Sequence, residues 1–525
     1  MALKKILGAL LVLAGATQVQ AQELRIGTQG DPSLDPHYMY IGTNVSIFRH
    51  LFGTLTMHDQ TGKILPSLAA SYRAIDDKTW EFKLRPDVKF KDGSVLTADD
   101  VVFSLKRAAE IPGNPSPYTS RLESIVGVEA PDPQTVLIRT SAPNPYVPDN
   151  MVDMAIVSRK SVEGKATGDF TSLKAMNEYG PYRVVSFTPG DRLVLERNPT
   201  FWGDKPYWEK VTFRVMTNDA TRVAALLSGD VDFIDFVPPS DVPKLKANPK
   251  IAVQTGPSTR MMFLLINFRT DAIPTNKDAD GKPLDKNPLL DLRVRQALSK
   301  SIDRKALVSR IMDGEGVPAS QVALPIMEGY DPKLEVDKYD PQGAKKLLAE
   351  AGYPKGFGLT IACSNNRYPN DDKVCQAVGQ MLSRGGFNPS VETVPMSILM
   401  PKLRGTPERG SEIALGMLGL GSQGTTPKAL TLVMHSINPS IGRGQYNFGR
   451  YSNAEFDRAV IDATTTLDQK QRDAKMRTAM DLATRDVAAL PLFFLNVITA
   501  SRADLTYSPD PAEETLAWLI LPKNK

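Results

Sequence analysis

Segments with helical spacing of apolar residues alternate with short apolar strands through the second half of this 525-residue chain. Strand-like runs at 357–364 and 412–418 lie between segments in which apolar residues recur every three or four positions. This alternation predicts an α/β fold, in which helices cover a mostly parallel or mixed sheet. The helical segments are residues 291–312, 340–352, 371–386, 452–464 and 469–486.

The first half of the chain reads differently, because strand patterns dominate it. Residues 79–90 alternate apolar and polar side chains, which is typical of a half-buried strand. We expect residues 61–180 to be a β-rich insert with short helices, one of them capped at its N-terminus by Thr97. Strand patterns continue over 181–265, and an apolar strand follows near the C-terminus at 488–501.

The N-terminus has the pattern of a signal peptide. Lys4 and Lys5 precede an apolar stretch at 6–16 that is too short to span a bilayer. Small residues then stand where a signal peptidase cleaves, so residues 1–21 are predicted to be removed after Ala21. No later apolar run has the length of a membrane-spanning helix, and the mature protein is expected to be exported and soluble.

The composition excludes several classes of function. The net charge of +4 is nearly balanced, and no basic block is interleaved with aromatic residues, so we expect no nucleic-acid partner. The four histidines lack metal-ligand spacing, and no nucleophile motif or carboxylate pair stands out. We therefore expect no metal, no cofactor and no enzymatic activity. The histidines are His37, His50, His58 and His435.

Glycines in the stretch 416–430 match the spacing of a dinucleotide-binding loop, G-x-G-x-x-G, at Gly419, Gly421 and Gly424. The match is formal, because no acidic residue for a ribose follows about 20 positions later. A Walker A loop is excluded as well, since Gly424 is followed by threonines and no lysine. Two interpretations stay open: a loop that presents backbone N–H groups to another ligand, or a tightly packed turn.

The two cysteines have one feature in common, because both lie near one predicted strand-to-helix junction. Cys363 ends the strand at 357–364, and Cys375 lies in the first turns of the helix that follows. In an oxidising compartment a disulfide between them is expected, with two buried free thiols as the alternative.

Five segments in order along the chain resemble the extracellular solute-binding proteins of family 5, the peptide, opine and nickel receptors of ABC importers. Each segment alone is a weak signal, but together they span nearly the whole mature chain. One of them, 65–107, resembles the signature region of that family. The segments are residues 65–107, 180–233, 292–308, 339–357 and 486–494.

The resemblance implies a two-lobed clamp of the type II periplasmic-binding class with an additional inserted domain. The first lobe is expected to be discontinuous, the inserted domain is 61–180, and the second ligand-binding lobe is 266–485. Crossing strands near residues 265 and 485 would form the hinge. The segments of the first lobe are 22–60, 181–265 and 486–525.

The same resemblance implies a function without catalysis. A peptide-like, opine-like or sugar-conjugate solute binds between the lobes and favours the closed state, which the permease subunits of an inner-membrane ABC importer recognise. We expect a monomer. A peptide-binding chaperone or a chemosensory receptor with this fold is the alternative.

Three loops and one asparagine are the ligand-binding candidates that the resemblance supplies. The first loop is N-terminal, the second joins a strand to a helix, and the third is the glycine loop. Arg367 matches the position that meets a ligand carboxylate in some peptide receptors. The candidates are Tyr40, Ile41, Gly42, Thr43, Arg367, Tyr368, Asn370, Leu420, Gly421, Ser422, Gln423, Thr426 and Asn447.

The glycine loop departs from the pattern of the di- and oligopeptide receptors. Those receptors carry an aspartate before the loop proline, where it pairs with the α-amino group of the ligand, and here Thr426 precedes Pro427. Leu420 stands in place of the usual tryptophan. A buried ammonium without a carboxylate costs several kcal/mol. A ligand with hydroxyls, an anionic group or a modified amine is therefore expected, such as an opine, a sugar derivative or a glutathione-like peptide.

Overall fold

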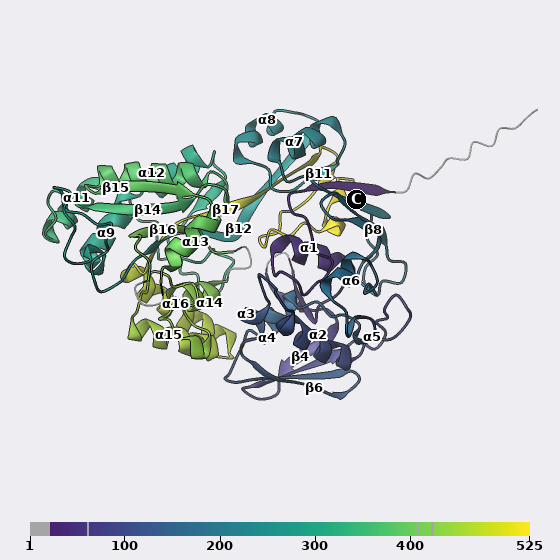
Figure 1. Ribbon diagram of the computed structural model, residues 1–525. Coiled ribbons are helices and arrows are strands. Elements are labelled where there is room, and N and C mark those ends of the chain that lie inside the picture. Colours follow the sequence, from purple (N-terminus) through teal and green to yellow (C-terminus); the bar gives the residue numbers. More distant parts are fainter. Residues whose placement is uncertain (1–21, 60–61, 407–409, 422–424, 525) are drawn as a thin grey trace, which may run out of the picture.

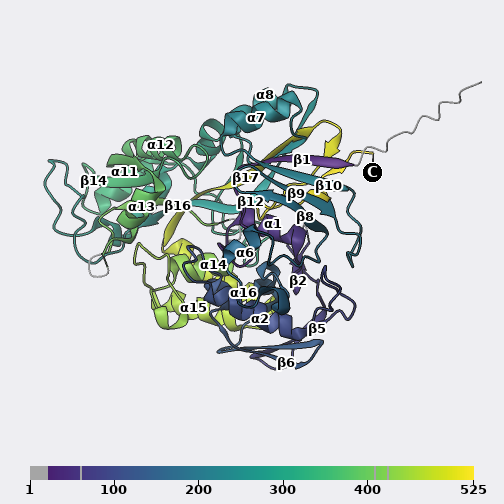
Figure 2. The same ribbon diagram turned by 45° about the vertical axis from the view of Figure 1, so that its right-hand side comes forward.

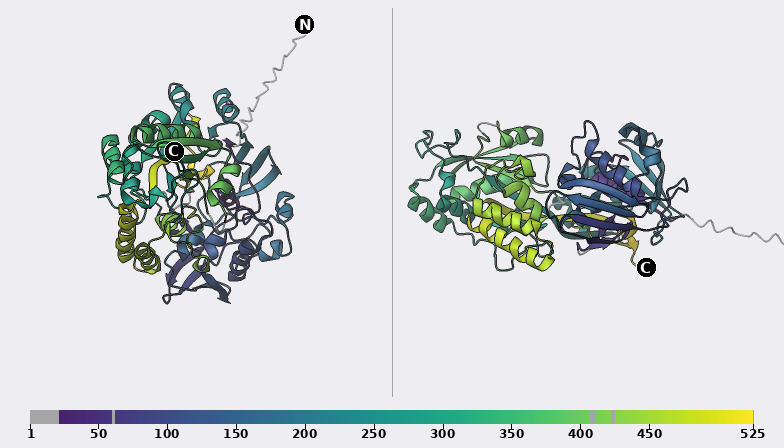
Figure 3. Two further views of the ribbon diagram at one scale, coloured as in Figure 1. Left: turned by 60° about the vertical axis from the view of Figure 1, so that its left-hand side comes forward. Right: turned by 90° about the horizontal axis from the view of Figure 1, so that it is seen from below.

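Two bodies lie side by side in the computed structural model, joined by a pair of long strands (Figure 1; Figure 3, right). The structure describes residues 22–59, 62–406, 410–421 and 425–524. The predicted signal peptide therefore lies outside the described residues. None of the described helices combines the length and the apolar character that crossing a membrane requires.

One mixed sheet of 11 strands runs through both bodies. Its order is β15-β14-β16-β12-β17-β11-β1-β10-β9-β8, and β13 pairs with β17 outside this path. The strands are β1 (Glu23–Thr28), β8 (Tyr182–Thr188), β9 (Arg192–Arg197), β10 (Lys210–Val215), β11 (Phe233–Ile234), β12 (Ile251–Ile266), β13 (Gly316–Pro318), β14 (Gly358–Ser364), β15 (Asn388–Val394), β16 (Leu415–Gly419) and β17 (Ala489–Arg502).

Strands β12 and β17 cross from one lobe to the other. The N-terminal half of β12 pairs with 496–502, and its C-terminal half pairs with 489–494 and with β16. The pairing is interrupted between Pro257 and Met261. We expected crossing strands near residues 265 and 485 to form the hinge, and the position of the hinge stays a prediction. Both strands stay paired inside the second lobe up to Leu265 and Ala489.

The first lobe contains the N-terminal and C-terminal segments together with the middle of the chain. Helices α7 and α8 lie on one side of its sheet, and α1 lies on the side that faces the inserted domain (Figures 1 and 2). Its further elements are α1 (Gly42–Leu51), β2 (Thr56–His58), α7 (Asp219–Ser228), η2 (Pro239–Asp241), α8 (Val242–Lys246), β18 (Leu505–Thr506), η7 (Ala517–Leu519) and β19 (Leu521–Pro522).

The inserted domain has its own antiparallel sheet of order β4-β5-β7-β6, yet it shares one continuous apolar core with the first lobe. Thr97 is the N-cap residue of α2, as predicted. The Asp100 carboxylate accepts a hydrogen bond from the backbone N–H of Thr97 at 2.9 Å. The elements are β3 (Ile64–Pro66), β4 (Ala69–Ala74), β5 (Thr79–Leu84), α2 (Ala98–Glu110), α3 (Thr119–Leu122), β6 (Ile125–Asp132), β7 (Thr135–Thr140), α4 (Val147–Asn150), η1 (Met151–Asp153), α5 (Arg159–Val162) and α6 (Thr167–Thr171).

The second lobe has apolar cores on both faces of its sheet. Successive residues of β12 contribute to opposite faces: Met262 and Leu264 to one core, Phe263 and Leu265 to the other. The helical elements are η3 (Pro288–Leu290), α9 (Leu292–Ser301), α10 (Arg304–Ala306), η4 (Leu307–Ile311), α11 (Pro341–Glu350), α12 (Asp371–Arg384), α13 (Met396–Arg404), α14 (Thr426–Lys428), η5 (Ala429–Met434), η6 (Pro439–Ile441), α15 (Ala454–Thr465) and α16 (Gln469–Arg485).

One predicted helix is wrong in extent. We expected a single helix over 291–312, but α9 ends at Ser301 and a new helical turn begins after Asp303. The Asp303 carboxylate accepts a hydrogen bond from the backbone N–H of Ala306 at 2.9 Å. An N-cap of this kind starts a helix, so it separates α9 from the α10–η4 segment.

Candidate functional site

Loop 38–43 connects β1 to α1 on the side of the first lobe that faces the inserted domain. Tyr40 is held on every polar atom: its backbone N–H and carbonyl oxygen pair with Ser116, and its hydroxyl donates to Asp153 at 2.6 Å. Arg121 donates to the same hydroxyl at 2.8 Å. Tyr40 therefore fixes the loop and offers a ligand only its ring.

The next three residues of this loop are more open. Ile41 is exposed and is the N-cap position of α1, with no side chain capping that helix end. Gly42 and Thr43 form the first turn of α1, so their backbone N–H groups lack intrahelical partners. Such a helix N-terminus favours an anionic group.

Thr43 borders a small hollow in the first lobe, with a volume of about 10 Å³, roughly the space of one water molecule. Asp235 lies in it, buried, with its carboxylate accepting from the Thr28 hydroxyl at 2.7 Å and the Gln29 N–H at 3.0 Å. Burial raises the pKa of Asp235 to about 6, against the effect of these hydrogen bonds. The hollow is lined by Thr28, Gly30, Pro32, Thr43, Ser46, Ile47, Phe213, Asp235, Phe236, Glu513 and Thr515.

Left-handed backbone conformations occur in the wall of this hollow. Two of the eight described non-glycine residues with positive φ line it, namely Phe236 at 47° and Glu513 at 63°. Such conformations are costly for residues with a Cβ and are frequent at ligand-binding sites. The backbone strain therefore marks the same region as the hollow.

An ion pair on a crossing strand connects this hollow to the second lobe. The Arg260 guanidinium on β12 binds Glu513 at 2.7 Å, and Glu513 also accepts from Ser258 Oγ at 2.8 Å. Burial opposes the charge of Arg260, but Glu513 and, more weakly, Tyr368 raise its pKa. Tyr368 belongs to the second lobe, so the two lobes meet the site through Arg260.

Loop 365–370 joins β14 to α12 and is fixed at both of its ends. Cys363 and Cys375 form a disulfide with Cα atoms 6.2 Å apart, which is the pairing that the sequence left open. The buried Asp371 carboxylate accepts from the Ser364 hydroxyl at 2.7 Å and from the N–H groups of residues 367 and 368 at 3.1 Å. The loop is therefore preorganised for binding.

Arg367 is exposed on this loop, with its guanidinium carbon 5.5 Å from the centre of the Tyr368 ring. Among the described residues, no ion pair or side-chain hydrogen bond engages that guanidinium. The Tyr368 hydroxyl donates to the Gly419 carbonyl at 3.4 Å. The Asn370 amide instead donates to the Ile311 carbonyl at 2.9 Å.

The glycine loop follows β16 and lies against Tyr368. The Leu420 N–H pairs with the Met261 carbonyl at 2.9 Å, and its side chain packs on a core of the second lobe. Gly421 is exposed, and a Cβ there would meet nothing within 4 Å. Ser422 and Gln423, also predicted as ligand contacts, lie outside the described residues.

Thr426 and Asn447 have opposite hydrogen-bonding states. Thr426 is fully buried, and its hydroxyl has no hydrogen-bond partner among the described residues. The Asn447 amide donates to the carbonyls of His435 at 2.9 Å and Tyr451 at 2.7 Å, and its oxygen accepts from the Tyr451 N–H. Asn447 is thus used to fold its own loop and keeps little capacity for a ligand.

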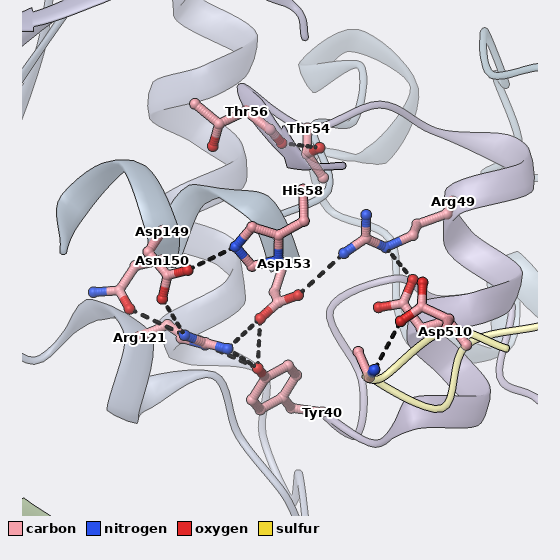
Figure 4. A network of polar contacts seen from close by, with 12 residues as sticks. Tyr40, Arg49, Thr54, Thr56, His58, Arg121, Asp149, Asn150, Asp153 and Asp510 are labelled. Atoms are coloured by element: carbon pink, nitrogen blue, oxygen red, sulfur yellow. Dashed lines mark hydrogen bonds and ion pairs between the residues drawn. The ribbon is translucent and has the colours of Figure 1, made fainter. Parts of the chain in front are cut away.

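A buried charge network underlies the first loop (Figure 4). Asp153 lies between two arginines, binding Arg121 directly and Arg49 at 3.4 Å. Arg49 also binds Glu514 at 2.7 Å. Although burial opposes ionisation, Arg121 and Arg49 lower the pKa of the Asp153 carboxyl. The network joins residues from four segments that are distant in the sequence, so no local sequence motif could predict it.

Lys428 is a residue of the second lobe that interacts electrostatically with this network. It follows the glycine loop on α14, and burial lowers its pKa to about 7, with Arg121 acting in the same direction. Asp149 and Asp153 of the inserted domain partly oppose that shift. Figure 1 shows α14 opposite α3 and α4, the helices that carry or precede these residues.

Direct contacts between side chains hold the second lobe against the inserted domain. The Tyr146 hydroxyl donates to the Glu328 carboxylate at 2.9 Å, and Arg472 donates to the same carboxylate at 2.7 Å. The Glu123 carboxylate packs on Gly442, where a Cβ would clash with it. The lobes therefore touch at the inserted domain as well as along the crossing strands.

Comparison with known proteins gives consistent matches. Residues 63–435 match the middle region of the bacterial extracellular solute-binding proteins, family 5. Glutathione-binding protein GsiB of Pectobacterium atrosepticum is 28% identical over 477 residues, covering 90% of this chain and 88% of that protein.

Solved structures agree with the fold. HbpA2 from Haemophilus parasuis has a TM-score of 0.80 at 22% identity, covering 95% of this chain and 100% of that one. MoaA from A. tumefacien R10, in complex with mannopinic acid, has a TM-score of 0.73 at 25% identity, covering 96% and 100%. The predicted two-lobed α/β fold and the receptor class, as opposed to an enzyme, are confirmed. The chain belongs to the bacterial extracellular solute-binding proteins of family 5.

Proposed function

We propose that this solute-binding protein captures a small peptide-like or opine-like solute that carries a carboxylate, and delivers it to an ABC importer from the periplasm. The proposal includes a monomer that reaches the periplasm after loss of residues 1–21. One observation carries the choice of ligand. Arg367 presents a guanidinium without an ion-pair partner among the described residues, on a loop held by a disulfide and by Asp371.

The chemistry around Arg367 supports an anionic ligand. A guanidinium forms two parallel hydrogen bonds with a carboxylate and is the usual residue for this task. On the opposite lobe, the uncapped N-terminus of α1 favours a second anionic or polar group. Beside Arg367, Tyr368 contacts the glycine loop, in which Gly421 is exposed.

The glycine loop supports a ligand without an ordinary peptide amine. Thr426 provides a hydroxyl where the resembling peptide receptors carry an aspartate, so no carboxylate meets an ammonium at this position. The relatives named as glutathione-binding proteins and the MoaA complex with mannopinic acid supply two ligands to test. Both solutes bear carboxylates.

The test is calorimetric titration of glutathione and of mannopinic acid into the wild-type protein and into Arg367→Ala. Loss of a charged hydrogen-bonding partner should weaken binding by about 1.5–3 kcal/mol. Arg384→Ala is the matched control, because Arg384 is an exposed arginine at the far end of α12, about 20 Å away.

The control should bind like the wild type. If Arg367→Ala retains the wild-type affinity for a ligand that does bind, Arg367 does not read the carboxylate. Native mass spectrometry of the protein as purified gives the mass of a co-purified solute independently. A co-purified peptide of ordinary α-linkage with a free amino terminus would contradict the role given to Thr426.

A further inference from the structure

A second cavity lies within the second lobe, apart from the three cleft loops. Its volume is about 380 Å³; it is bordered by α9, α11, the end of α16 and the chain after β13, and it is partly open to solvent. None of its lining residues belongs to the loops 38–43, 365–370 or 419–427. Cavities of this size hold small molecules in other proteins.

Arg304 is the buried charge of this cavity. The side chain is 3% exposed, and its guanidinium donates to the Pro491 carbonyl at 2.6 Å, the Ser299 carbonyl at 3.2 Å and the Ser299 hydroxyl at 2.9 Å. All three acceptors are uncharged, and no described carboxylate forms an ion pair with it. Burial lowers the pKa of Arg304 to about 10, while Asp337 partly opposes that shift.

The two acids of the lining balance Lys300 and Arg304 in number, but among the described residues neither acid forms an ion pair with either cation. Lys300 has no ion pair among the described residues, whereas Arg485 is paired with Asp481 at 3.0 Å. Of the two lining acids, Asp337 accepts from the Ser299 hydroxyl and Glu335 is exposed. A buried guanidinium without a counterion is costly, and an anion in the cavity would offset that cost.

The rest of the wall mixes polar and apolar side chains. Apolar side chains from four elements face this space, so a ligand buries hydrocarbon as well as an anionic group. These apolar residues are Val322, Leu347, Met434, Met480, Val487 and Pro491.

We propose that this cavity is a second small-molecule site, which binds an amphipathic carboxylate with its acid group at Arg304 and Lys300 and its hydrocarbon part against Met434 and Met480. The site is separate from the interlobe cleft and does not depend on the proposed ligand of the cleft. Two methionines in the wall make it directly observable.

The test uses NMR of the protein labelled with ¹³C in its methionine methyl groups, titrated with sodium hexanoate. We expect the methyl signals of Met434 and Met480 to shift and that of Met262 to stay in place. Met262 reports on the cleft, because its sulfur is 3.1 Å from the position of a Cβ on Gly419. Hexan-1-ol is the control ligand without a charge.

Three variants make the result decisive. Lys300→Met removes one unpaired charge and should weaken hexanoate about tenfold. Thr484→Trp fills the cavity from the end of α16 and should abolish the shifts, whereas Arg367→Ala should leave them unchanged. Arg304 is not substituted, because its guanidinium donates three hydrogen bonds that stabilise the fold.

Other results overturn the proposal. These are the absence of shifts at both methionines up to the solubility limit of hexanoate, equal shifts with hexan-1-ol, shifts at Met262 instead, or unchanged affinity in Lys300→Met. The methionine spectrum of each variant without ligand shows that it is folded, so a lost response in Thr484→Trp reports the site.

Discussion

The contact of Tyr146 with Glu328 gives a direct test of how the lobes stay together. Tyr146 belongs to the inserted domain, while Glu328 and its second partner Arg472 belong to the second lobe. Separation of the lobes breaks the tyrosine bond and leaves the arginine bond intact. Tyr146→Phe removes the hydroxyl and keeps the ring, which packs 5.4 Å from the Arg472 guanidinium carbon.

The expected magnitude follows from the charged acceptor. A hydrogen bond to an ionised group contributes about 1.5–3 kcal/mol, and the partly exposed position of Tyr146 favours the lower figure. The ratio of closed to open molecules should therefore fall about tenfold. When the open form dominates without ligand, the apparent affinity for the solute of the cleft falls by the same factor.

Single-molecule fluorescence energy transfer measures this ratio without knowledge of the ligand. Dyes attach to Lys165→Cys on the inserted domain and Lys346→Cys on α11, both exposed positions. The native cysteines form a disulfide and do not compete for label. Tyr72→Phe is the matched control, because the Tyr72 hydroxyl binds Ile64 within the inserted domain. Identical closed populations in the Tyr146 and Tyr72 variants would refute the reasoning.

Two further predictions concern stability. His50 is buried and neutral, with Nδ1 paired to the Ser46 carbonyl and Nε2 to the Ala517 N–H, and burial lowers its pKa to about 4. The unfolded chain takes up this proton near pH 6.5, so stability is lost as the pH falls from 6.5 towards 4, by about 3 kcal/mol. Urea unfolding at several pH values should show a smaller loss in His50→Gln than in the wild type, and parallel curves would contradict this. The disulfide closes a loop of sequence separation 12, so replacing Cys363 and Cys375 by serine should destabilise the protein by about 3 kcal/mol. Thermal unfolding with and without reductant measures this destabilisation. If reductant also lowers the stability of the serine variant, the effect of reductant has a cause other than the disulfide.

The sequence predicted those parts of the fold that local patterns determine. The strand that ends at Cys363, the helix that begins at Asp371 and the cap at Thr97 all follow from residues within one turn or one strand of each other. The helix over 291–312 was too long, because its apolar spacing continues through Ile302 while the competing cap at Asp303 is a single residue.

The site was less predictable than the fold. Arg367 lies at a strand end that the pattern indicated, and its exposure agrees with a role in binding, which stays a prediction. The sequence could not predict side-chain orientation. The amides of Asn370 and Asn447 donate hydrogen bonds to nearby backbone carbonyls. The Arg49–Asp153–Arg121 network joins residues up to 104 positions apart, and no spacing rule connects such partners.

Strand β17 has a consequence for how this chain is made. It is the last long element to leave the ribosome, yet it pairs with β11 and half of β12 in the first lobe and with β13 and the other half of β12 in the second. Until residues 489–502 arrive, both bodies have an open sheet edge at their centre. Neither lobe can be complete before β17 has been made, and C-terminal truncation before Ala489 should leave a protein that aggregates.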